Sequence, residues 1–156
     1  MPASYFLARS HLMNGLATEF YPPVSYNCLF REDFLTLYLN KSDNWIYADW
    51  TGFQTNETIK NGSEHLLQAI LDSGVHKLIN DNTHLTGMKA NAVEWLALNF
   101  APRLQTAGLQ YLSWIYKTNS FSEASADLVL STSKTDIIVI VFDNVAMAEK
   151  WLRSVV

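Results

Sequence analysis

The alternation of hydrophobic and polar positions in the middle of the chain predicts a β-hairpin followed by a helix. Between residues 34 and 39 every second position is leucine, which is typical of a strand with one buried face. A polar turn follows, and the apolar run at 45–50 supplies the second strand. Residues 56–73 then repeat apolar side chains at helical spacing. We predict that this first helix closes at Gly74, since glycine commonly follows the last turn of a helix.

The rest of the chain alternates short apolar runs with amphipathic segments. The pattern predicts, in order, a buried strand at 75–80, a helix over 88–104, a strand at 109–116, a short helix ending near 130, a strand at 136–142, and a last helix capped by Asp143 or Asn144. Pro102 is expected to bend or end the last turns of the long helix, and Gly108 to close them. Ser120 and Glu123 have the spacing of a capping box at the start of the short helix.

This order of elements, ββαβαβαβα, predicts an α/β fold. Because a helix separates each later strand from the next, right-handed crossovers should lay these strands parallel to one another. The first strand of the hairpin should lie antiparallel at one side of the sheet. The expected architecture is therefore a mixed, mostly parallel sheet packed with helices.

The N-terminal residues 1–24 show no clear period and end near the pair Pro22-Pro23, which favours an extended path. We predict an N-terminal arm at 1–24 that either packs on the domain or on a second subunit, or extends loosely. The remainder, 25–156, is expected to form one domain, because a chain of 156 residues is long enough for one core and short for two.

Composition and charge narrow the classes of partner. The formal net charge is -4 and Lys and Arg form no cluster, which argues against nucleic acid, because phosphate binding needs concentrated positive charge. Cys28 is the only cysteine, so an internal disulfide is excluded and a reducing, cytoplasmic location is expected. The longest apolar run, at 137–142, is far shorter than the roughly 20 residues of a membrane-spanning helix. We predict neither a nucleic-acid partner nor a membrane span.

Three stretches of the sequence carry a family resemblance. They read Asp-Phe-Leu-Thr-Leu-Tyr at 33–38, Tyr-Ala-Asp-Trp-Thr-Gly-Phe-Gln at 47–54 and Leu-Ile-Asn-Asp-Asn-Thr at 78–83. Together with the element order and the lack of a glycine-rich phosphate loop, they resemble STAS domains, and more closely a bacterial branch of single-domain SpoIIAA-like proteins without a settled activity. The resemblance covers residues 26–156. It implies the STAS fold and a regulatory, protein-binding role like that of the anti-sigma-factor antagonists.

The resemblance also points to one modification site. In the antagonists, a motif Asp-Ser-Ser/Thr-Gly-Leu at the start of a helix carries a serine that a partner kinase phosphorylates. The matching stretch here is His-Leu-Thr-Gly-Met at 84–88, which keeps only the Ser/Thr-Gly-apolar half. The resemblance therefore implies Thr86 as a phosphoacceptor, because a helix N-terminus would stabilise the added charge. The alternative is that Thr86 is only the N-cap of the second helix.

The polar run after the third predicted strand is the candidate binding site. In open α/β sheets, ligands lie beyond the carboxyl ends of the strands, where loops diverge and helix N-termini point inward. That end of the predicted sheet collects five consecutive polar residues, Asn80, Asp81, Asn82, Thr83 and His84. Either they contact a ligand or partner, or they bond the backbone of neighbouring loops and hold the connection closed.

Aromatic and ionisable side chains add to this candidate site. Trp50 and Phe53 follow the second hairpin strand, where such a pair lines an apolar pocket or a protein interface if it is not simply core. Asp81 and His84 have the chemistry of an acid/base pair or of half a metal site, but no third ligand can be placed. Cys28 has no neighbour that would activate a nucleophile. We predict no catalytic residue, no metal and no cofactor.

These observations favour a non-enzymatic regulatory module that docks a protein partner or a second copy of itself as a homodimer. The alternative is a carrier or sensor of a small apolar or anionic ligand, held between Trp50, Phe53, Trp114 and the N-terminus of the second helix. An enzyme that uses Asp81 and His84 ranks last. A cavity lined by aromatic side chains beneath Trp50 would favour the carrier, and a flat exposed patch would favour docking.

Overall fold

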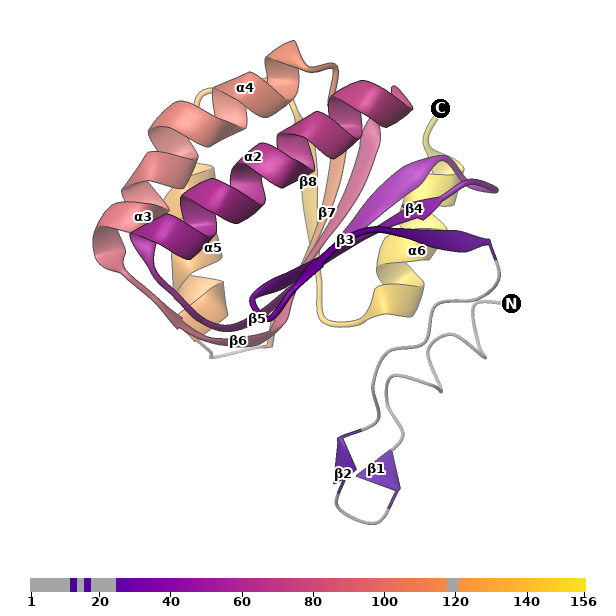
Figure 1. The fold of residues 1–156 in the computed structure, drawn as a ribbon. Coiled ribbons are helices and arrows are strands. Elements are labelled where there is room, and N and C mark those ends of the chain that lie inside the picture. The colour runs from indigo at the N-terminus through magenta and orange to yellow at the C-terminus, as the bar shows by residue number, and fades with distance from the viewer. Residues whose placement is uncertain (1–11, 14–15, 18–24, 118–120) are drawn as a thin grey trace.

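A six-stranded sheet carries the other elements of the fold. The computed structural model describes residues 12–13, 16–17, 25–117 and 121–156. The strands of the sheet follow the order β3-β4-β5-β6-β7-β8, so neighbours in sequence are neighbours in space (Figure 1). The pairs from β3 to β5 are antiparallel, and the pairs from β5 to β8 are parallel. The predicted mixed, mostly parallel sheet of an α/β fold is confirmed.

The predicted arm falls largely outside the described residues. Within it, β1 (Leu12–Met13) and β2 (Leu16–Ala17) form a separate antiparallel pair. The boundary between arm and domain at 24/25 therefore stays a prediction. None of the helices in the described part of the chain has both the length and the apolar character needed to cross a membrane.

The hairpin that opens the predicted domain consists of β4 (Leu35–Asn40) and β5 (Trp45–Gln54). The two strands pair antiparallel with Leu37 opposite Ala48, which brings the alternating leucines of β4 to the same face as alternate residues of β5. Asn44 has a φ of 61° in the turn between them, a left-handed conformation that asparagine tolerates well. The hairpin prediction is confirmed, although β5 continues beyond Trp50.

One strand of the sheet was missing from the prediction. β3 (Tyr26–Glu32) pairs antiparallel with β4 and forms the edge of the sheet. Its register shifts between Cys28 and Phe30, which marks a bulge. A bulge inserts one residue into the strand and breaks the period of two, and most of β3 is exposed, so its sequence lacks the alternation that identifies a strand.

Helix α2 (Asn56–Ser73) has the predicted bounds. Thr55 is its N-cap, and its hydroxyl accepts a hydrogen bond from the Thr58 N–H at 3.2 Å. At the other end Gly74 adopts φ 65°, and its N–H donates to the Ile70 carbonyl. The predicted closure at Gly74 is confirmed, because only glycine takes this left-handed conformation without steric strain.

The second long helix is continuous but contains a wide turn. It consists of α3 (Ala90–Trp95), the π-helical segment η1 (Leu96–Phe100) and α4 (Ala101–Thr106). Pro102 follows the wide turn directly; it lacks an N–H, and its ring would clash with a carbonyl in a regular helix. The π-helical turn accommodates the proline, so Pro102 neither ends the helix nor caps it. Gly108, with φ 102°, follows the helix as predicted.

The remaining elements complete the predicted alternation of strands and helices. They are β6 (Lys77–Met88), β7 (Tyr111–Ile115), α5 (Phe121–Thr132), β8 (Ile138–Phe142) and α6 (Val145–Ser154). Asn144, one of the two predicted caps, accepts a hydrogen bond from the Met147 N–H at 2.9 Å. The proposed capping box of Ser120 and Glu123 rests on a residue outside the described part of the chain.

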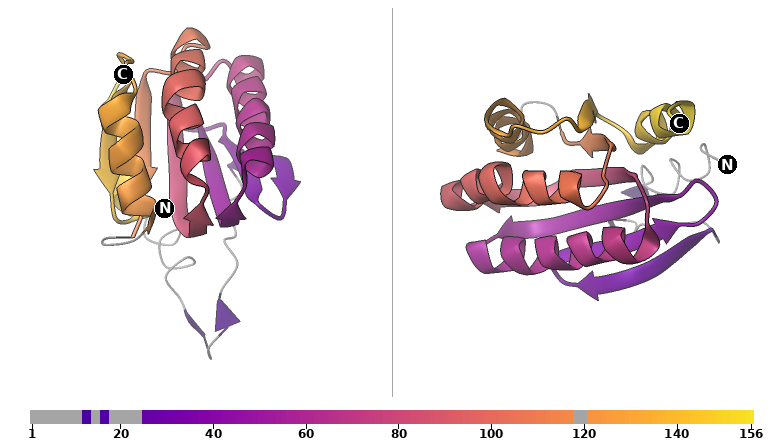
Figure 2. Two further views of the ribbon diagram at one scale, coloured as in Figure 1. Left: turned by 90° about the vertical axis from the view of Figure 1, so that its left-hand side faces the viewer. Right: turned by 90° about the horizontal axis from the view of Figure 1, so that it is seen from above.

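The helices divide unequally between the two faces of the sheet. In Figure 2, α2, the α3–α4 helix and α5 lie side by side over one face, and α6 covers the other. The larger hydrophobic core lies under the layer of three helices, and includes Leu35, Leu78 and Phe100. The smaller core, which includes Trp45 and Tyr47, packs against Leu152 of α6. We call these two sides the three-helix face and the α6 face.

The predicted strand ended at Asn80, with the rest of the polar run at 81–84 as a connection after it, and this is wrong. The whole run belongs to β6, which continues to Met88 and pairs with β5 as far as Gln54. β7 pairs with β6 only as far as Asp81, so the last part of β6 forms a two-stranded ribbon with β5. A polar sequence can continue a strand here because β5 satisfies its backbone groups and its side chains find specific partners.

We predict that Gly62→Ala lowers the free energy of unfolding by about 1–2 kcal/mol. Alanine normally stabilises a helix interior relative to glycine by about 1 kcal/mol. A Cβ at position 62 of α2, however, would lie 2.6 Å from a ring carbon of Trp50 and 2.9 Å from Leu35, and such overpacking costs roughly 1–3 kcal/mol or more. Urea denaturation should show this loss, whereas Asn61→Ala at the exposed neighbouring position should be neutral or stabilising. Equal stability of the two variants would contradict the close packing.

Candidate functional site

Strand β6 distributes the candidate polar residues between the two faces of the sheet. Successive side chains of a strand point to opposite faces. Asn80 and Asn82 therefore join the three-helix face, where both line a cavity. Asp81 lies between them in sequence and binds Tyr47, a member of the smaller core on the α6 face. The predicted cluster is thus two separate polar groups and not one site.

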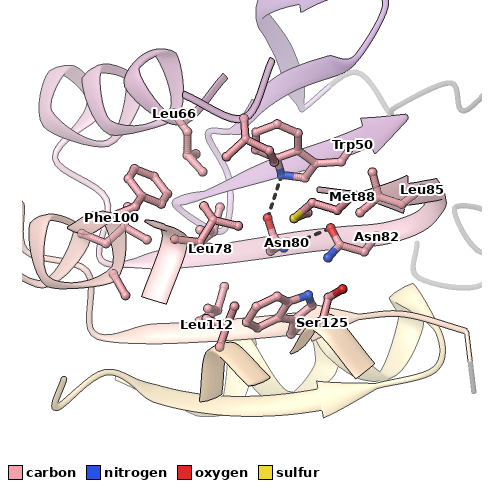
Figure 3. A pocket seen from close by; sticks show the side chains of 16 residues that line it. Trp50, Leu66, Leu78, Asn80, Asn82, Leu85, Met88, Phe100, Leu112 and Ser125 are labelled. Carbon is pink, nitrogen blue, oxygen red and sulfur yellow. Dashed lines mark hydrogen bonds between the residues drawn. The ribbon is translucent and has the colours of Figure 1, made fainter. Parts of the chain in front are cut away.

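A cavity of about 80 Å³ lies between the sheet and the layer of three helices. Residues of β5, β6 and β7 form its wall on the sheet side, and residues of α2, the α3–α4 helix and α5 form its wall on the helix side. Figure 3 shows side chains from both layers around the shared space, among them Leu66 of α2, Phe100 of η1 and Ser125 of α5. The described residues that line it are Trp50, Ile59, Leu66, Leu78, Asn80, Asn82, Leu85, Met88, Leu96, Phe100, Ala101, Leu104, Leu112, Trp114, Ser125 and Val129.

A chain of hydrogen bonds runs along the sheet side of this cavity. The Trp50 Nε1–H donates to the Asn80 side-chain oxygen at 2.9 Å, and the Asn80 amide donates to the Asn82 oxygen at 3.2 Å (Figure 3). Trp50 and Asn82 are both buried. The two carboxamides are thereby held in fixed orientations beside an otherwise apolar space, because an unbonded amide in such a place is unfavourable.

Trp114 on β7 completes the polar side of the cavity. It stands directly opposite Asn80 in the parallel pairing of β6 with β7, so the two side chains share a face. The Trp114 ring is 7% exposed, and its Nε1 is buried without a hydrogen-bond partner in the described structure. The two tryptophans of the cavity therefore differ: Trp50 has its donor satisfied by the protein, and Trp114 does not.

Asp81 has a structural environment on the α6 face. Its carboxylate is fully buried and accepts hydrogen bonds from the Tyr47 hydroxyl, from the Thr83 N–H at 2.9 Å and from the Thr83 hydroxyl at 2.7 Å. A buried carboxylate requires several donors of this kind. The arrangement matches the predicted alternative in which these polar residues bond the neighbouring chain.

His84, Phe53 and Thr86 lie on the ribbon formed by β5 and β6 and do not line the cavity. The His84 Nδ1 is 3.1 Å from an Asp49 carboxylate oxygen, whereas Asp81 engages Tyr47 and Thr83. Phe53 is 53% exposed, and Thr86 is exposed as well.

The prediction that Thr86 caps the second helix is wrong. Thr86 lies within β6, and the helix begins at Ala90 with Lys89 as its N-cap. Its hydroxyl is therefore not at a helix N-terminus, and a phosphate on Thr86 would lack the stabilisation by the helix dipole that the sequence suggested. Thr86 as a phosphoacceptor stays a prediction on the resemblance alone.

Within the described part of the chain, no group of three or more His, Cys, Asp or Glu side chains could hold a metal ion. Among the described residues that line the cavity, none carries a carboxylate, imidazole, amine, guanidinium or thiol. The chemistry available in the cavity is therefore packing against apolar and aromatic surfaces, together with hydrogen bonds from neutral groups.

Sequence reasoning missed a buried carboxyl group on α6. Glu149 is 2% exposed and accepts a hydrogen bond from the Tyr26 hydroxyl at 3.2 Å, which in turn accepts from the Trp45 Nε1–H at 2.7 Å. Burial raises the pKa of Glu149 to about 7, against the opposing effects of Arg153 and Tyr26; nearby Asp43 raises it further. Arg153 lies 3.7 Å from Glu149 and binds Asp43 at 3.0 Å. The one sequence signal for this cluster was that Glu149 occupies a position of the last helix that the helical spacing assigns to its apolar, buried side.

Two solved structures share this fold. One is a protein from Shewanella loihica described as an uncharacterised member of the DUF3478 family with a SpoIIAA-like fold; it is 15% identical, the match covers 81% of this chain and 91% of that one, and the TM-score is 0.50. The other is the anti-sigma factor antagonist SpoIIAA in its unphosphorylated form, with 12% identity, 83% and 99% coverage, and a TM-score of 0.50. No protein-family model and no curated protein matches the sequence. The chain thus has the SpoIIAA-like, STAS-type fold that the resemblance predicted.

The raised pKa of Glu149 predicts that stability falls as the pH rises from about 4.5 to about 7. In this window the folded state keeps a proton that the unfolded state has lost, so folding becomes less favourable as the pH rises. Glu149→Gln removes the titration and can keep the hydrogen bond from Tyr26. We expect the variant to gain on the order of 2–3 kcal/mol over the parent at pH 8, and little at pH 4.5, since one pH unit between the two pKa values is worth about 1.4 kcal/mol.

Urea denaturation of the parent and Glu149→Gln between pH 4.5 and 8 measures this difference. Glu94→Gln, at an exposed position on α3, is the matched control and should follow the parent at every pH. A constant gap between Glu149→Gln and the parent across the range would contradict the raised pKa.

Proposed function

We propose that this chain is a non-enzymatic binding module that holds a small molecule in the cavity between the sheet and the three-helix layer. The observation that carries this proposal is the lining itself. An apolar space of about 80 Å³ is bordered by two tryptophans and two oriented carboxamides. Binding sites for small molecules are commonly apolar and aromatic, with a few polar groups that fix the orientation of the ligand.

The size of the cavity supports a role beyond imperfect packing. Protein interiors contain few voids larger than a water molecule. A cavity of this volume lowers stability by about 2 kcal/mol, at about 24 cal/mol per Å³. A ligand that fills it recovers contacts with Trp50, Trp114 and the surrounding aliphatic side chains, and would stabilise the folded state in proportion to its affinity.

The chemistry of the lining favours binding over turnover. General acid–base catalysis needs a titratable group within hydrogen-bond reach of the substrate. The candidates for that role are elsewhere: Asp81 is bonded to Tyr47 and Thr83, and His84 is exposed on the ribbon beside Asp49. The hydroxyl of Ser125 lines the cavity without an imidazole or carboxylate beside it in the lining.

A second candidate function is a regulatory module that docks a protein partner or a second copy of the chain. Two observations favour it: the fold is shared with SpoIIAA, an anti-sigma factor antagonist, and the ribbon exposes Phe53 at 53% beside Gly87. Exposed aromatic residues are enriched at interfaces.

The single free cysteine, Cys28, is exposed, which supports the expected cytoplasmic location because an exposed thiol is stable in a reducing compartment.

We predict that Ala101→Leu abolishes the binding of small apolar guests. Ala101 lines the cavity at the start of α4, and leucine adds three carbon atoms that would occupy much of the space. The probe is xenon, which enters dry apolar cavities. The xenon-129 chemical shift should respond more strongly to the parent protein than to Ala101→Leu at equal concentration.

The matched control is Ala90→Leu, the same substitution at an exposed position at the start of α3. It should respond to xenon as the parent does, and circular dichroism should show that both variants are folded. A response of Ala101→Leu equal to that of the parent, or no excess response of the parent over an unfolded sample, would contradict the proposed cavity function and leave docking as the better supported one.

A further inference from the structure

We propose that the ligand of the cavity is a small, neutral, planar molecule with one hydrogen-bond acceptor, which accepts from the Trp114 Nε1–H. The inference rests on the proposed function, because it takes the cavity to be the binding site. It goes further by choosing between the apolar and the anionic ligands that the sequence left open. Three features of the lining carry it: its charge, its one unsatisfied donor, and its shape.

The charge of the described lining argues against an anionic ligand. None of the described residues that line the cavity is basic, so they would give a buried anion no counter-ion. The burial of such an anion is far less favourable than the burial of a neutral polar group. The N-terminus of the second helix was expected to attract an anion. This helix begins at Ala90 with Lys89 as its N-cap, and neither residue lines the cavity.

The unsatisfied donor defines the polar group of the ligand. An indole nitrogen can only donate a hydrogen bond. The Trp114 Nε1 is buried, lacks a partner in the described structure, and belongs to a side chain that lines the cavity opposite Asn80. A buried donor without a partner destabilises the folded state, because it has lost its hydrogen bond to water. A ligand with a carbonyl, nitrile or ring-nitrogen acceptor would remove this penalty, and a purely apolar ligand would leave it in place.

The placement of the two tryptophans favours a flat ligand. Trp50 on β5 and Trp114 on β7 belong to the two strands that flank β6, and both line the same cavity. Between them on β6 are Asn80 and Asn82. Aromatic side chains make their best contacts with other planar groups. The volume of about 80 Å³ limits the ligand to a single small ring, because an apolar cavity of roughly 150 Å³ holds benzene.

Three ring compounds of similar size separate these features. Benzonitrile is neutral and planar and carries an acceptor; phenylacetylene has nearly the same shape without a strong acceptor; benzoate is the anion. Binding is measured by titration of protein labelled with nitrogen-15 at tryptophan, which reports each indole N–H separately. We expect benzonitrile to bind about threefold to tenfold more tightly than phenylacetylene, the range of one net hydrogen bond. Benzoate should bind more weakly than both, and the Trp114 indole signal should move most with benzonitrile.

Trp114→Phe tests the donor directly. It removes the indole N–H, so the preference for benzonitrile over phenylacetylene should vanish even if the enlarged cavity changes both affinities. The ratio of the two affinities is therefore the measurement, and it does not depend on equal stability. Trp151→Phe is the matched control, because Trp151 packs against Tyr111 and Phe142 on the α6 face and does not line the cavity. This variant should keep the preference of the parent.

The outcomes distinguish the ligand class from the cavity function. Equal binding of benzonitrile and phenylacetylene, a preference that survives in Trp114→Phe, or tightest binding of benzoate would overturn the proposed ligand class. If xenon binds and none of the three ring compounds does, the ligand class is wrong and the cavity function stands. If xenon fails as well, both proposals fall.

Discussion

The hydrogen bond from the Trp50 indole to Asn80 is the constraint on which the three-helix face depends. The Trp50 ring packs against α2 at Gly62, where it leaves no room for a larger residue. Because Trp50 is buried in a mostly apolar layer, its ring N–H needs a hydrogen-bond acceptor there. The Asn80 side-chain oxygen is that acceptor, and the Asn80 amide group in turn donates a hydrogen bond to the Asn82 oxygen. The Trp50 donor is thus joined to two polar residues of β6 in a lining that is otherwise mostly apolar.

The two faces of the sheet solve the problem of buried polar groups differently. On the α6 face, Asp81 receives the Tyr47 hydroxyl and both donors of Thr83, and Glu149 is joined to Tyr26. The Asp81 cluster ties β5 to β6, and the bond between Tyr26 and Glu149 ties β3 to α6. On the three-helix face, the unmatched Trp114 donor lines the same cavity as the Trp50–Asn80–Asn82 chain of hydrogen bonds. A satisfied network holds a structure together, whereas an unsatisfied one offers a contact to another molecule.

Features set by residues near one another in the sequence were predicted, and features set by contacts between distant residues were not. The hairpin, the end of α2 at Gly74 and the cap at Asn144 depend on local periodicity and local hydrogen bonds, and they were predicted correctly. The strand character of residues 81–88 was missed because pairing with β5, and not the local composition, makes a polar run extended. The structure brings Trp50, Asn80 and Asn82 together on the strands of the sheet, whereas the prediction placed them on loops at its rim. The cavity itself depends on cross-strand register and helix position, which periodicity does not encode.

The geometry of β6 decides how the two proposed functions relate. A ligand in the cavity would contact β6 at Asn80, Asn82 and Leu85, while His84 and Thr86, on either side of Leu85, are exposed on the ribbon. β7 no longer pairs with β6 beyond Asp81, so β5 is the only strand that pairs with this part of β6. The side chains that would contact a ligand and those that are exposed therefore follow one another on the same short stretch of strand. A cavity placed beneath a singly supported strand is suited to a sensor, because occupancy and surface shape are properties of the same few residues.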